Sequence, residues 1–189
     1  MKEIEILVPV LDEKKKVLRV LRRFEFKSVK QTRDIFFFDP QRNNLQIKNN
    51  KYPKEWFRIR LKGDKSYMTY KKDIFDKDEK WLYSHEHETE VGDFFKLKQI
   101  IEKLGYAKLV EINTKKHIFI TKEYEIIFEE VQNLGNFLEV EKLNVKERAN
   151  VKKIRKEIQQ FIDGLDFCVG PELNIGKPEL MLRERNSKL

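Results

Sequence analysis

Glutamate side chains recur on one face of a predicted β-hairpin at residues 124–143. The segment reads YEIIFEEVQNLGNFLEVEKL, in which acidic and apolar residues alternate on both sides of an Asn-Leu-Gly-Asn turn. Because alternate residues of a strand point to the same face, Glu129, Glu139 and Glu141 should come together. Carboxylates gathered in this way repel one another. Solvent, basic side chains or metal ions must therefore offset their charge.

Basic side chains alternate in the same way over residues 55–62. Arg58, Arg60 and Lys62 share one face of this predicted strand, and apolar residues share the other. Two like charges at adjacent same-face positions are unfavourable unless an anion lies beside them. Because a guanidinium group binds phosphate oxygens through two hydrogen bonds, Arg58 and Arg60 are candidate phosphate ligands.

These residues belong to a set of predicted strands that each carry ionisable side chains on one face. Taken singly, such alternation is typical of an antiparallel sheet with one solvated side. Amphipathic helices are predicted at 12–23, 93–104 and 146–165, with Asp12 and Asp93 as the N-cap candidates of the first two. These helices could instead cover the apolar faces from outside. The charged faces would then close into a barrel with a wet, charged lumen. The predicted strands are 3–10, 24–30, 34–39, 55–62, 66–72, 81–91, 110–120 and the two of the hairpin, with a short strand at Leu45-Gln46-Ile47.

The composition bounds the class of protein. With 189 residues and 40% hydrophobic content, the chain is expected to form a single domain, 1–189, with a sizeable core. The net charge of +8 suits nucleic acid, a membrane surface or a phosphorylated small molecule. Because the basic residues are scattered among acids rather than clustered, nucleic acid is not expected as a partner.

The chain also lacks the usual signals for export or membrane insertion. Cys168 is the single cysteine, which excludes an internal disulfide and fits a reducing compartment. The first residues, MKEIEILVPV, are unlike a signal peptide. No apolar run approaches the ~20 residues that a membrane helix needs. We therefore expect a cytoplasmic protein without a membrane partner.

Seven blocks of sequence, in order from residue 3 to about 182, resemble the CYTH superfamily of class IV adenylyl cyclases and thiamine triphosphatases. EIE at the start resembles the ExExK opening of that family, and QTRDIFFFD, WFRIRLK, TYKKD and EHETEVGD follow in order. EEVQNLGNFLEVE is similar to the DEVEGLGxFxExE hairpin of the class IV cyclase branch. The tail GKPELML resembles the SYxxLL element of that branch.

The resemblance implies an α+β fold, namely a closed antiparallel β barrel of about eight strands with helices packed outside, known as the triphosphate tunnel. It implies Mg²⁺ or Mn²⁺ as cofactor and a triphosphate of the ATP or thiamine triphosphate class as ligand. The implied metal ligands are Glu3, Glu5, Glu88, Glu129, Glu139 and Glu141. The implied phosphate ligands are Arg58, Arg60, Lys71 and Lys116, with Lys62 beside them and Lys115 as the alternative to Lys116.

The function implied is that of an adenylyl cyclase, which converts ATP to cyclic AMP and pyrophosphate. Two alternatives stay open: a triphosphatase acting on thiamine triphosphate or tripolyphosphate, and a non-catalytic phosphate-binding module. The sequence identifies no general base, and a homodimer is implied by the resemblance alone.

Three positions depart from the family pattern. Leu7 stands where the opening motif has Lys, so one phosphate-binding charge is missing. Ser84 falls where the cyclase branch often has Arg. Glu129 replaces an Asp, which keeps the charge and lengthens the side chain. Outside these motifs, His117 lies among lysines and is a further candidate for a phosphate contact.

Overall fold

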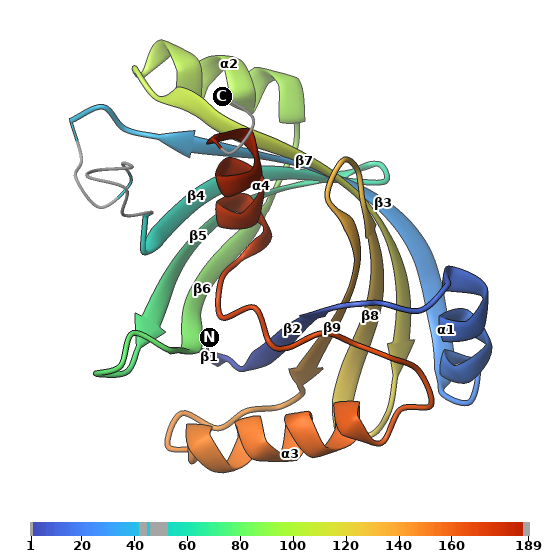
Figure 1. Ribbon diagram of the computed structural model, residues 1–189. Helices are drawn as coiled ribbons and strands as arrows, with labels where there is room; N and C mark the ends of the chain where they lie inside the picture. Colours follow the sequence, from blue (N-terminus) through green and yellow to red (C-terminus); the bar gives the residue numbers. More distant parts are fainter. Residues whose placement is uncertain (1, 42–44, 46–52, 187–189) are drawn as a thin grey trace.

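The computed structural model describes residues 2–41, 45 and 53–186 (Figure 1). The nine strands in this part of the chain form one antiparallel sheet that curls into a nearly closed barrel, in the order β1-β6-β5-β4-β3-β7-β8-β9-β2. The strands are β1 Lys2–Glu3, β2 Glu5–Pro9, β3 Glu25–Phe38, β4 Glu55–Lys62, β5 Lys65–Phe75, β6 Trp81–Val91, β7 Ala107–Ile120, β8 Tyr124–Val131 and β9 Gly135–Lys142. The helices are α1 Lys14–Leu21, α2 Phe94–Lys103, α3 Val151–Asp163 and α4 Lys177–Asn186. The predicted antiparallel barrel is confirmed.

The N-terminal segment, which contains β1 and β2, closes the barrel by pairing with both ends of the sheet. β1 pairs with β6, whereas β2 pairs with β9. Ile4 lies between them, is fully buried, and accepts a hydrogen bond from the backbone of Lys142. The single strand predicted at 3–10 is therefore two strands. The resemblance implied about eight strands, and the described part of the chain forms nine.

The strands predicted at 24–30 and 34–39 form one continuous strand, β3. Polar residues in the middle of this segment suggested a break, but Thr32 pairs with β4 on one side and β7 on the other. Its side chain is buried in the barrel, which explains why a polar residue lies inside a strand. In the predicted strand at 45–47, Gln46 and Ile47 lie outside the described residues.

Local signals set the turns and most of the helix starts. In the β8–β9 turn, Asn133 and Gly135 both have positive φ, as the predicted hairpin requires. Asp93 caps α2 by accepting a hydrogen bond from the backbone of Lys96, as predicted. The predicted cap at Asp12 is wrong, because its carboxylate instead accepts a hydrogen bond from the backbone of Cys168. This carboxylate therefore ties down the C-terminal segment.

The apolar faces of the strands point outward, and three helices cover them. α1 and α3 bury one cluster against the barrel, and α2 buries a second cluster against β3 and β4. The first contains Ile4, Ile6, Val8, Val17, Leu21, Phe119, Ile126, Phe128, Leu138, Val140, Ile158, Ile162, Leu165 and Phe167. The second contains Ile35, Phe37, Ile59, Phe94 and Ile101. The charged faces of the strands are consequently left to line the lumen.

The fourth helix, α4, does not pack outside the barrel. Its Met181 and Leu182 join an apolar cluster with Leu7, Phe36 and Trp56, which lie on the lumen side at one end of the barrel. The three predicted helices, α1–α3, pack outside the barrel as expected, whereas α4 is a fourth helix that was not predicted. The tail shows a contiguous apolar piece rather than a helical period, so its sequence did not indicate a helix.

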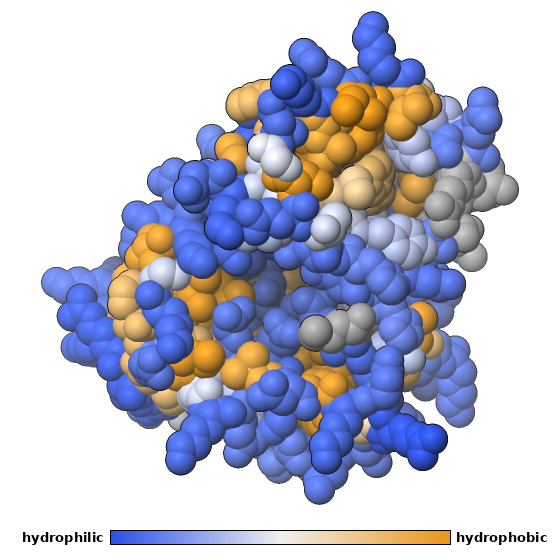
Figure 2. Space-filling view, turned by 180° about the vertical axis from the view of Figure 1, so that it is seen from behind, coloured by the Kyte–Doolittle hydropathy of each residue, from blue (hydrophilic) through white to orange (hydrophobic). Residues whose placement is uncertain are grey.

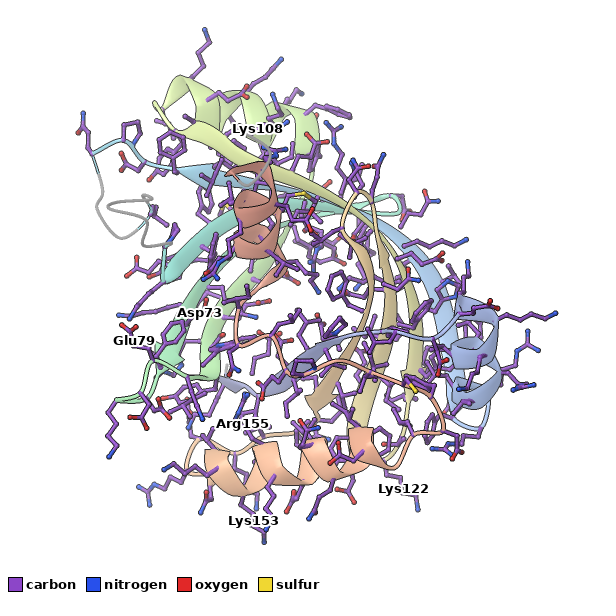
Figure 3. All side chains as sticks on the ribbon, in the orientation of Figure 1. Asp73, Glu79, Lys108, Lys122, Lys153 and Arg155 are labelled. Carbon is purple, nitrogen blue, oxygen red and sulfur yellow. The ribbon has the colours of Figure 1, made fainter. Side chains whose placement is uncertain are left out.

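The segment before α4 runs along the free edge of β2. The backbone of Gly170 donates to the carbonyl of Pro9, and that of Leu173 donates to the carbonyl of Leu7. Arg155 of α3 strengthens the same seam: it donates to the carbonyls of Glu5 and Leu82 and pairs with Glu172. Figure 3 shows Arg155 on the side of α3 that faces the barrel and Lys153 on the opposite side.

The outer surface is mainly hydrophilic, as the charged content of 38% leads us to expect (Figure 2). Apolar side chains gather near the top of this view, at the end of the molecule where α2 lies in Figure 1. Phe95 and Ile100 of α2 and the adjoining Leu104 are exposed apolar residues. Among the described helices, none is long and apolar enough to cross a membrane.

The packing of α3 gives a stability prediction. Ile158 is fully buried between the helix and the barrel, so Ile158→Ala should lower the free energy of unfolding by about 2–5 kcal/mol. Ile100→Ala, at a side chain that is 56% exposed, should change it by less than about 1 kcal/mol. Urea unfolding measures both changes. Equal losses in the two variants would contradict this description of the core.

Candidate active site

The lumen is hollow and strongly charged. Its cavity has a volume of about 160 Å³, far more than one buried water molecule needs. Nine acidic and six basic side chains line it. The acids are Glu3, Glu5, Asp34, Asp73, Glu86, Glu88, Glu125, Glu139 and Glu141; the bases are Arg58, Arg60, Lys62, Lys71, Lys116 and Lys177. The charged strand faces therefore face one another across a lumen, and the alternative of a sheet with one solvated side is wrong.

The sequence-predicted residues converge on this lumen. The metal and phosphate ligands implied by the resemblance all line the cavity, except Glu129 and Lys115, the alternative to Lys116. Glu129 is fully buried against the side chains of Lys116 and Lys177. Lys115 is exposed, whereas Lys116 is buried and points inward, so the structure selects Lys116 of the two. The roles assigned to these residues in binding metal or phosphate stay predictions.

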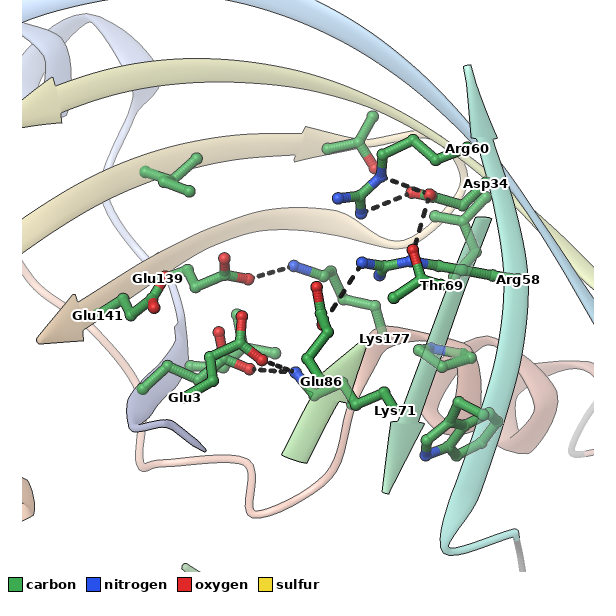
Figure 4. Close-up of a pocket in the computed structure, with 18 of the residues that line it drawn as sticks. Glu3, Asp34, Arg58, Arg60, Thr69, Lys71, Glu86, Glu139, Glu141 and Lys177 are labelled. Atoms are coloured by element: carbon green, nitrogen blue, oxygen red, sulfur yellow. Dashed lines mark hydrogen bonds and ion pairs between the residues drawn. The ribbon is translucent and has the colours of Figure 1, made fainter. Parts of the chain in front are cut away.

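The two arginines of β4 are held in different ways (Figure 4). Arg60 makes two hydrogen bonds to Asp34, with Nε 2.6 Å from Oδ1 and Nη2 3.2 Å from Oδ2. Burial opposes ionisation of Asp34, but Arg60 and Arg58 outweigh it and hold the pKa of Asp34 below its usual value. Arg58 has looser contacts, with Nη2 3.7 Å from carboxylate oxygens of Glu86 and Glu88.

One nitrogen of Arg58 has no hydrogen-bond partner in the part of the chain that the structure describes. This nitrogen, Nε, is buried. A buried donor without a partner is unfavourable by about 1–3 kcal/mol or more, so it favours an acceptor bound in the lumen. Asp34, which fixes Arg60, was not predicted as a site residue. Its place on the lumen face follows from the alternation of Thr32, Asp34 and Phe36 along β3.

Lys71 of β5 holds the two acids of the N-terminal strands. Its Nζ lies 2.6 Å from Glu3 Oε2 and 3.0 Å from Glu5 Oε1. Burial raises the pKa of both carboxyls, but Lys71 outweighs it at Glu3, whose pKa is lowered. At Glu5 burial wins, and the pKa rises to about 8. One ammonium group therefore does not fully compensate two buried carboxylates.

Lys177, the first residue of α4, is the functional candidate that the sequence did not reveal. Its Nζ lies 2.5 Å from Glu129 Oε2 and 2.5 Å from Glu139 Oε2. Lys116 contacts the other oxygen of Glu129, at 2.8 Å. Burial raises the pKa of Glu139, but Lys177 and Lys116 outweigh it and lower that pKa well below its usual value. The signal was the tail motif GKPELML, whose lysine had no assigned role.

This contact bears on the departure at Leu7. Leu7 is buried and pairs directly with Glu139 in the ladder between β2 and β9. Lys177 therefore brings an ammonium group to the cross-strand neighbour of the position where the family motif has its lysine. The charge that the first strand lacks is supplied by the last helix.

The departure at Ser84 has a structural role. Ser84 is fully buried, and its hydroxyl donates to Asp73 Oδ1 at 2.7 Å and accepts from the Trp81 indole at 3.1 Å. The other oxygen of Asp73 accepts from the Trp56 indole at 2.7 Å. Ser84 therefore helps to fix two aromatic rings of the lumen wall.

Three carboxylates stand side by side across β2, β9 and β8. Glu141 pairs with Glu5 on one side and with Glu125 on the other. Within the described chain its carboxylate has no hydrogen bond or ion pair. Burial, followed by the charges of Glu3 and Glu5, raises the pKa of Glu141 to about 9. This row is where the lumen most needs a proton or a cation.

The chemistry of these side chains suits a divalent ion, because carboxylate oxygens are the ligands that Mg²⁺ and Mn²⁺ prefer. In the described ranges, however, no three His, Cys, Asp or Glu side chains converge as a ready metal site. Lys71 and Lys177 instead hold four of the predicted ligands. The metal-binding role therefore stays a prediction that the donor atoms fit.

His117 does not line the lumen. Its Nε2 lies 2.9 Å from Glu130 Oε1, which Lys14 of α1 also contacts at 2.8 Å. In the ladder, His117 alternates with Lys116, whose side chain points inward. The proposed phosphate contact of His117 is therefore not supported by its position.

Comparison with known proteins agrees with the barrel and its lumen. The family model of the CYTH domain matches residues 1–168. A Methanocaldococcus jannaschii protein named as a putative adenylate cyclase is 30% identical over 167 residues, which are 87% of this chain and 90% of that protein. This chain therefore belongs to the CYTH domain family.

Solved structures share the fold at lower identity. The PH1819 protein from Pyrococcus horikoshii has a TM-score of 0.81 at 23% identity, over 97% of this chain and 99% of that one. A Hippeastrum protein, described as a putative adenylyl cyclase with a dominant triphosphatase activity, has a TM-score of 0.65 at 14% identity, over 99% and 97% of the two chains. Both likenesses concern the fold.

The carboxylate row gives a pH prediction. Unfolded Glu141 ionises near pH 4.5, whereas the folded group holds its proton up to about pH 9, so folding must take up a proton between these values. The wild-type protein should therefore lose stability as the pH rises through this range. Glu141→Gln should remove the part of this loss that Glu141 causes and raise the Tm at pH 8 by at least about 2–4 °C, equivalent to about 1 kcal/mol.

Thermal melts at pH 5 and pH 8 check this, with Glu13→Gln as the control. Glu13 is exposed, and its side chain makes no capping hydrogen bond to α1. The gain of Glu141→Gln over the control should grow with pH. A gain that is the same at both pH values would show that proton uptake at Glu141 is not its cause.

Proposed function

We propose that the lumen binds the triphosphate group of a nucleotide and, with Mg²⁺ or Mn²⁺, acts as an adenylyl cyclase that converts ATP to cyclic AMP and pyrophosphate. The observation that carries this proposal is Arg58, which lines the lumen and whose buried Nε, 4.0 Å from Asp34 Oδ1, lacks a hydrogen-bond partner in the described chain. An anionic oxygen is the acceptor that suits a guanidinium donor. The Methanocaldococcus jannaschii relative, named as a putative adenylate cyclase, supports the choice of reaction.

The charge balance supports a role for divalent ions. The cavity carries three more acidic than basic side chains, and a triphosphate would add further negative charge. Cations or protons must therefore enter with the substrate. A bound divalent ion would neutralise phosphate oxygens and lower the pKa of a hydroxyl group that it contacts.

The side chains of the chain would position the phosphates. Arg58, whose contacts with Asp34, Glu86 and Glu88 are all 3.7 Å or longer, would bind phosphate through its guanidinium group. Arg60 would be held in place by Asp34. Lys71 and Lys116 would contribute ammonium groups from the neighbouring walls. In the reaction, the ribose 3′-oxygen forms a bond to the α-phosphorus and loses its proton, while the bond from that phosphorus to the bridging oxygen of pyrophosphate breaks.

A triphosphatase is the second candidate. Water would attack the terminal phosphorus instead. The bond from that phosphorus to the bridging oxygen would break, and orthophosphate would be released. The cavity volume of about 160 Å³, with α4 closing one end, favours a compact phosphate chain such as tripolyphosphate or the tail of thiamine triphosphate. The same basic residues would serve both reactions, so product analysis must separate them.

Product analysis tests both candidates. The protein is incubated with ATP, thiamine triphosphate or tripolyphosphate, each with Mg²⁺ or Mn²⁺ and each with excess chelator as control. Cyclic AMP with pyrophosphate identifies a cyclase, and metal-dependent orthophosphate release identifies a triphosphatase. Tight binding of all three without turnover would leave a non-catalytic phosphate-binding module and overturn both enzymatic proposals.

The arginines are tested by Arg58→Ala with Arg60→Ala. Each hydrogen bond to a charged group contributes about 1.5–3 kcal/mol, so the affinity for tripolyphosphate should fall at least about 100-fold. The matched control is Arg19→Ala with Arg22→Ala, which removes the same charge from exposed positions at α1. Calorimetric titration measures both.

Because Arg60 neutralises the buried Asp34, a single Arg58→Gln variant guards against misfolding. It keeps the Arg60–Asp34 pair and should still weaken binding about tenfold or more. If the double variant and the single variant both bind tripolyphosphate as the control does, the lumen is not the phosphate site.

A further inference from the structure

Lys177 holds a position that suits a cation shared by two buried acids. Its Nζ lies equally close to one oxygen of Glu129 and one of Glu139, and Figure 4 shows it reaching from α4 towards Glu139. We propose that the Lys177 ammonium group is an internal substitute for a divalent cation: metal binding between Glu129 and Glu139 displaces it and releases α4 from the end of the lumen. This inference rests on the divalent ion of the proposed function.

The two acids require a cation at all times. Glu129 is fully buried, and the side chain of Glu139 is 13% exposed. A buried carboxylate that loses its partner destabilises a protein by about 3–5 kcal/mol, so neither group tolerates an unfilled site. Lys116 contacts Oε1 of Glu129 alone, which leaves the space between the two Oε2 atoms to Lys177.

Lys177 and a metal ion cannot hold these oxygens together. At 2.5 Å the ammonium group already occupies the space between the two Oε2 atoms. A second cation at the same oxygens would meet strong repulsion in a site shielded from water. A divalent ion brings twice the charge and binds oxygens at closer range than an ammonium group does, so it can replace Lys177.

Displacement of Lys177 must act on α4, because this lysine begins the helix. Met181 and Leu182 pack against Leu7 and Trp56 at the closed end of the lumen, one to two turns further along the helix. The two ion pairs of Lys177 therefore anchor the end of α4 that lies deepest in the lumen. Without these ion pairs, the helix keeps only the apolar contacts of Met181 and Leu182, and its attachment to the end of the lumen should weaken.

The coupling is reciprocal. When Lys177 holds α4 at the end of the lumen, the affinity for metal falls by a certain factor. Metal binding lowers the equilibrium constant for holding α4 there by the same factor. The lumen would consequently be closed when no metal is present and would open at the α4 end as metal enters. Neutral substitution of Lys177 should therefore tighten metal binding, whereas neutral substitution of a lysine remote from the two acids should leave the affinity for metal unchanged.

The test uses the full-length protein without nucleotide. Mn²⁺ binding is measured by calorimetry for the wild type, for Lys177→Met and for Lys152→Met, which removes an exposed lysine of α3 as a matched control. Lys177→Met should bind Mn²⁺ about tenfold more tightly than the wild type, within the usual range of coupling between sites. The control should bind as the wild type does.

Hydrogen exchange gives the second measurement. Saturating Mg²⁺ should speed exchange of the backbone amides of residues 177–186 in the wild type, while the α3 amides stay protected. In Lys177→Met these α4 amides should exchange quickly before metal is added. If the variant does not fold, as judged by its thermal melt, the wild-type exchange alone decides the question.

Two results would overturn the proposal: metal binding that leaves α4 fully protected in the wild type, or a Lys177→Met variant that binds Mn²⁺ no more tightly. Failure to bind metal at all would also overturn it. None of these results depends on turnover. If metal binding speeds hydrogen exchange in α4 but no triphosphate is cleaved, the proposed function alone is wrong. If triphosphate is cleaved but α4 stays protected when metal binds, this inference alone is wrong.

Discussion

The structure depends on pairing charges inside a lumen that is largely shielded from water. Each buried acid would be costly alone, and Arg60, Lys71 and Lys177 each offset one or two of them. The pairing is incomplete, because acids outnumber bases and the pKa values of Glu5 and Glu141 are raised. The same excess of acidic side chains gives the lumen an affinity for added cations. Stability and binding thus draw on one set of contacts.

The charged lumen is possible because the outer faces of the strands supply the core. In most small barrels the interior is filled with apolar side chains, and the stabilising contacts lie inside. Here α1 and α3 bury a large apolar cluster against one part of the outer wall, and α2 covers another. The lumen is thereby relieved of most packing, and an apolar cluster inside the barrel forms where α4 closes one end.

Most of the barrel could be predicted from the sequence, because the alternation of charged and apolar residues along a strand is a local property. The hairpin turn, the cap at Asp93 and the inward faces of Arg58 and Glu139 all follow from spacing over a few residues. What the sequence could not show depends on contacts between distant segments. Lys177 becomes a site residue because α4 folds back into the lumen, and an apolar run of three residues gives no helical period to reveal it. Asp34 was missed for a related reason: the polar stretch before it suggested the end of a strand.

The closing of the barrel by the N-terminal strands has a consequence for how the chain folds. Glu5 of β2 pairs with Glu141 of β9, so β2 finds its partner only after more than a hundred further residues have emerged during synthesis. Contacts this distant in sequence form slowly, since a long loop must be ordered before they stabilise anything. Until then both edges of the sheet are open to pairing with other chains. The many charges on the inward faces, which serve ligand binding in the closed barrel, would during that interval keep nascent chains apart.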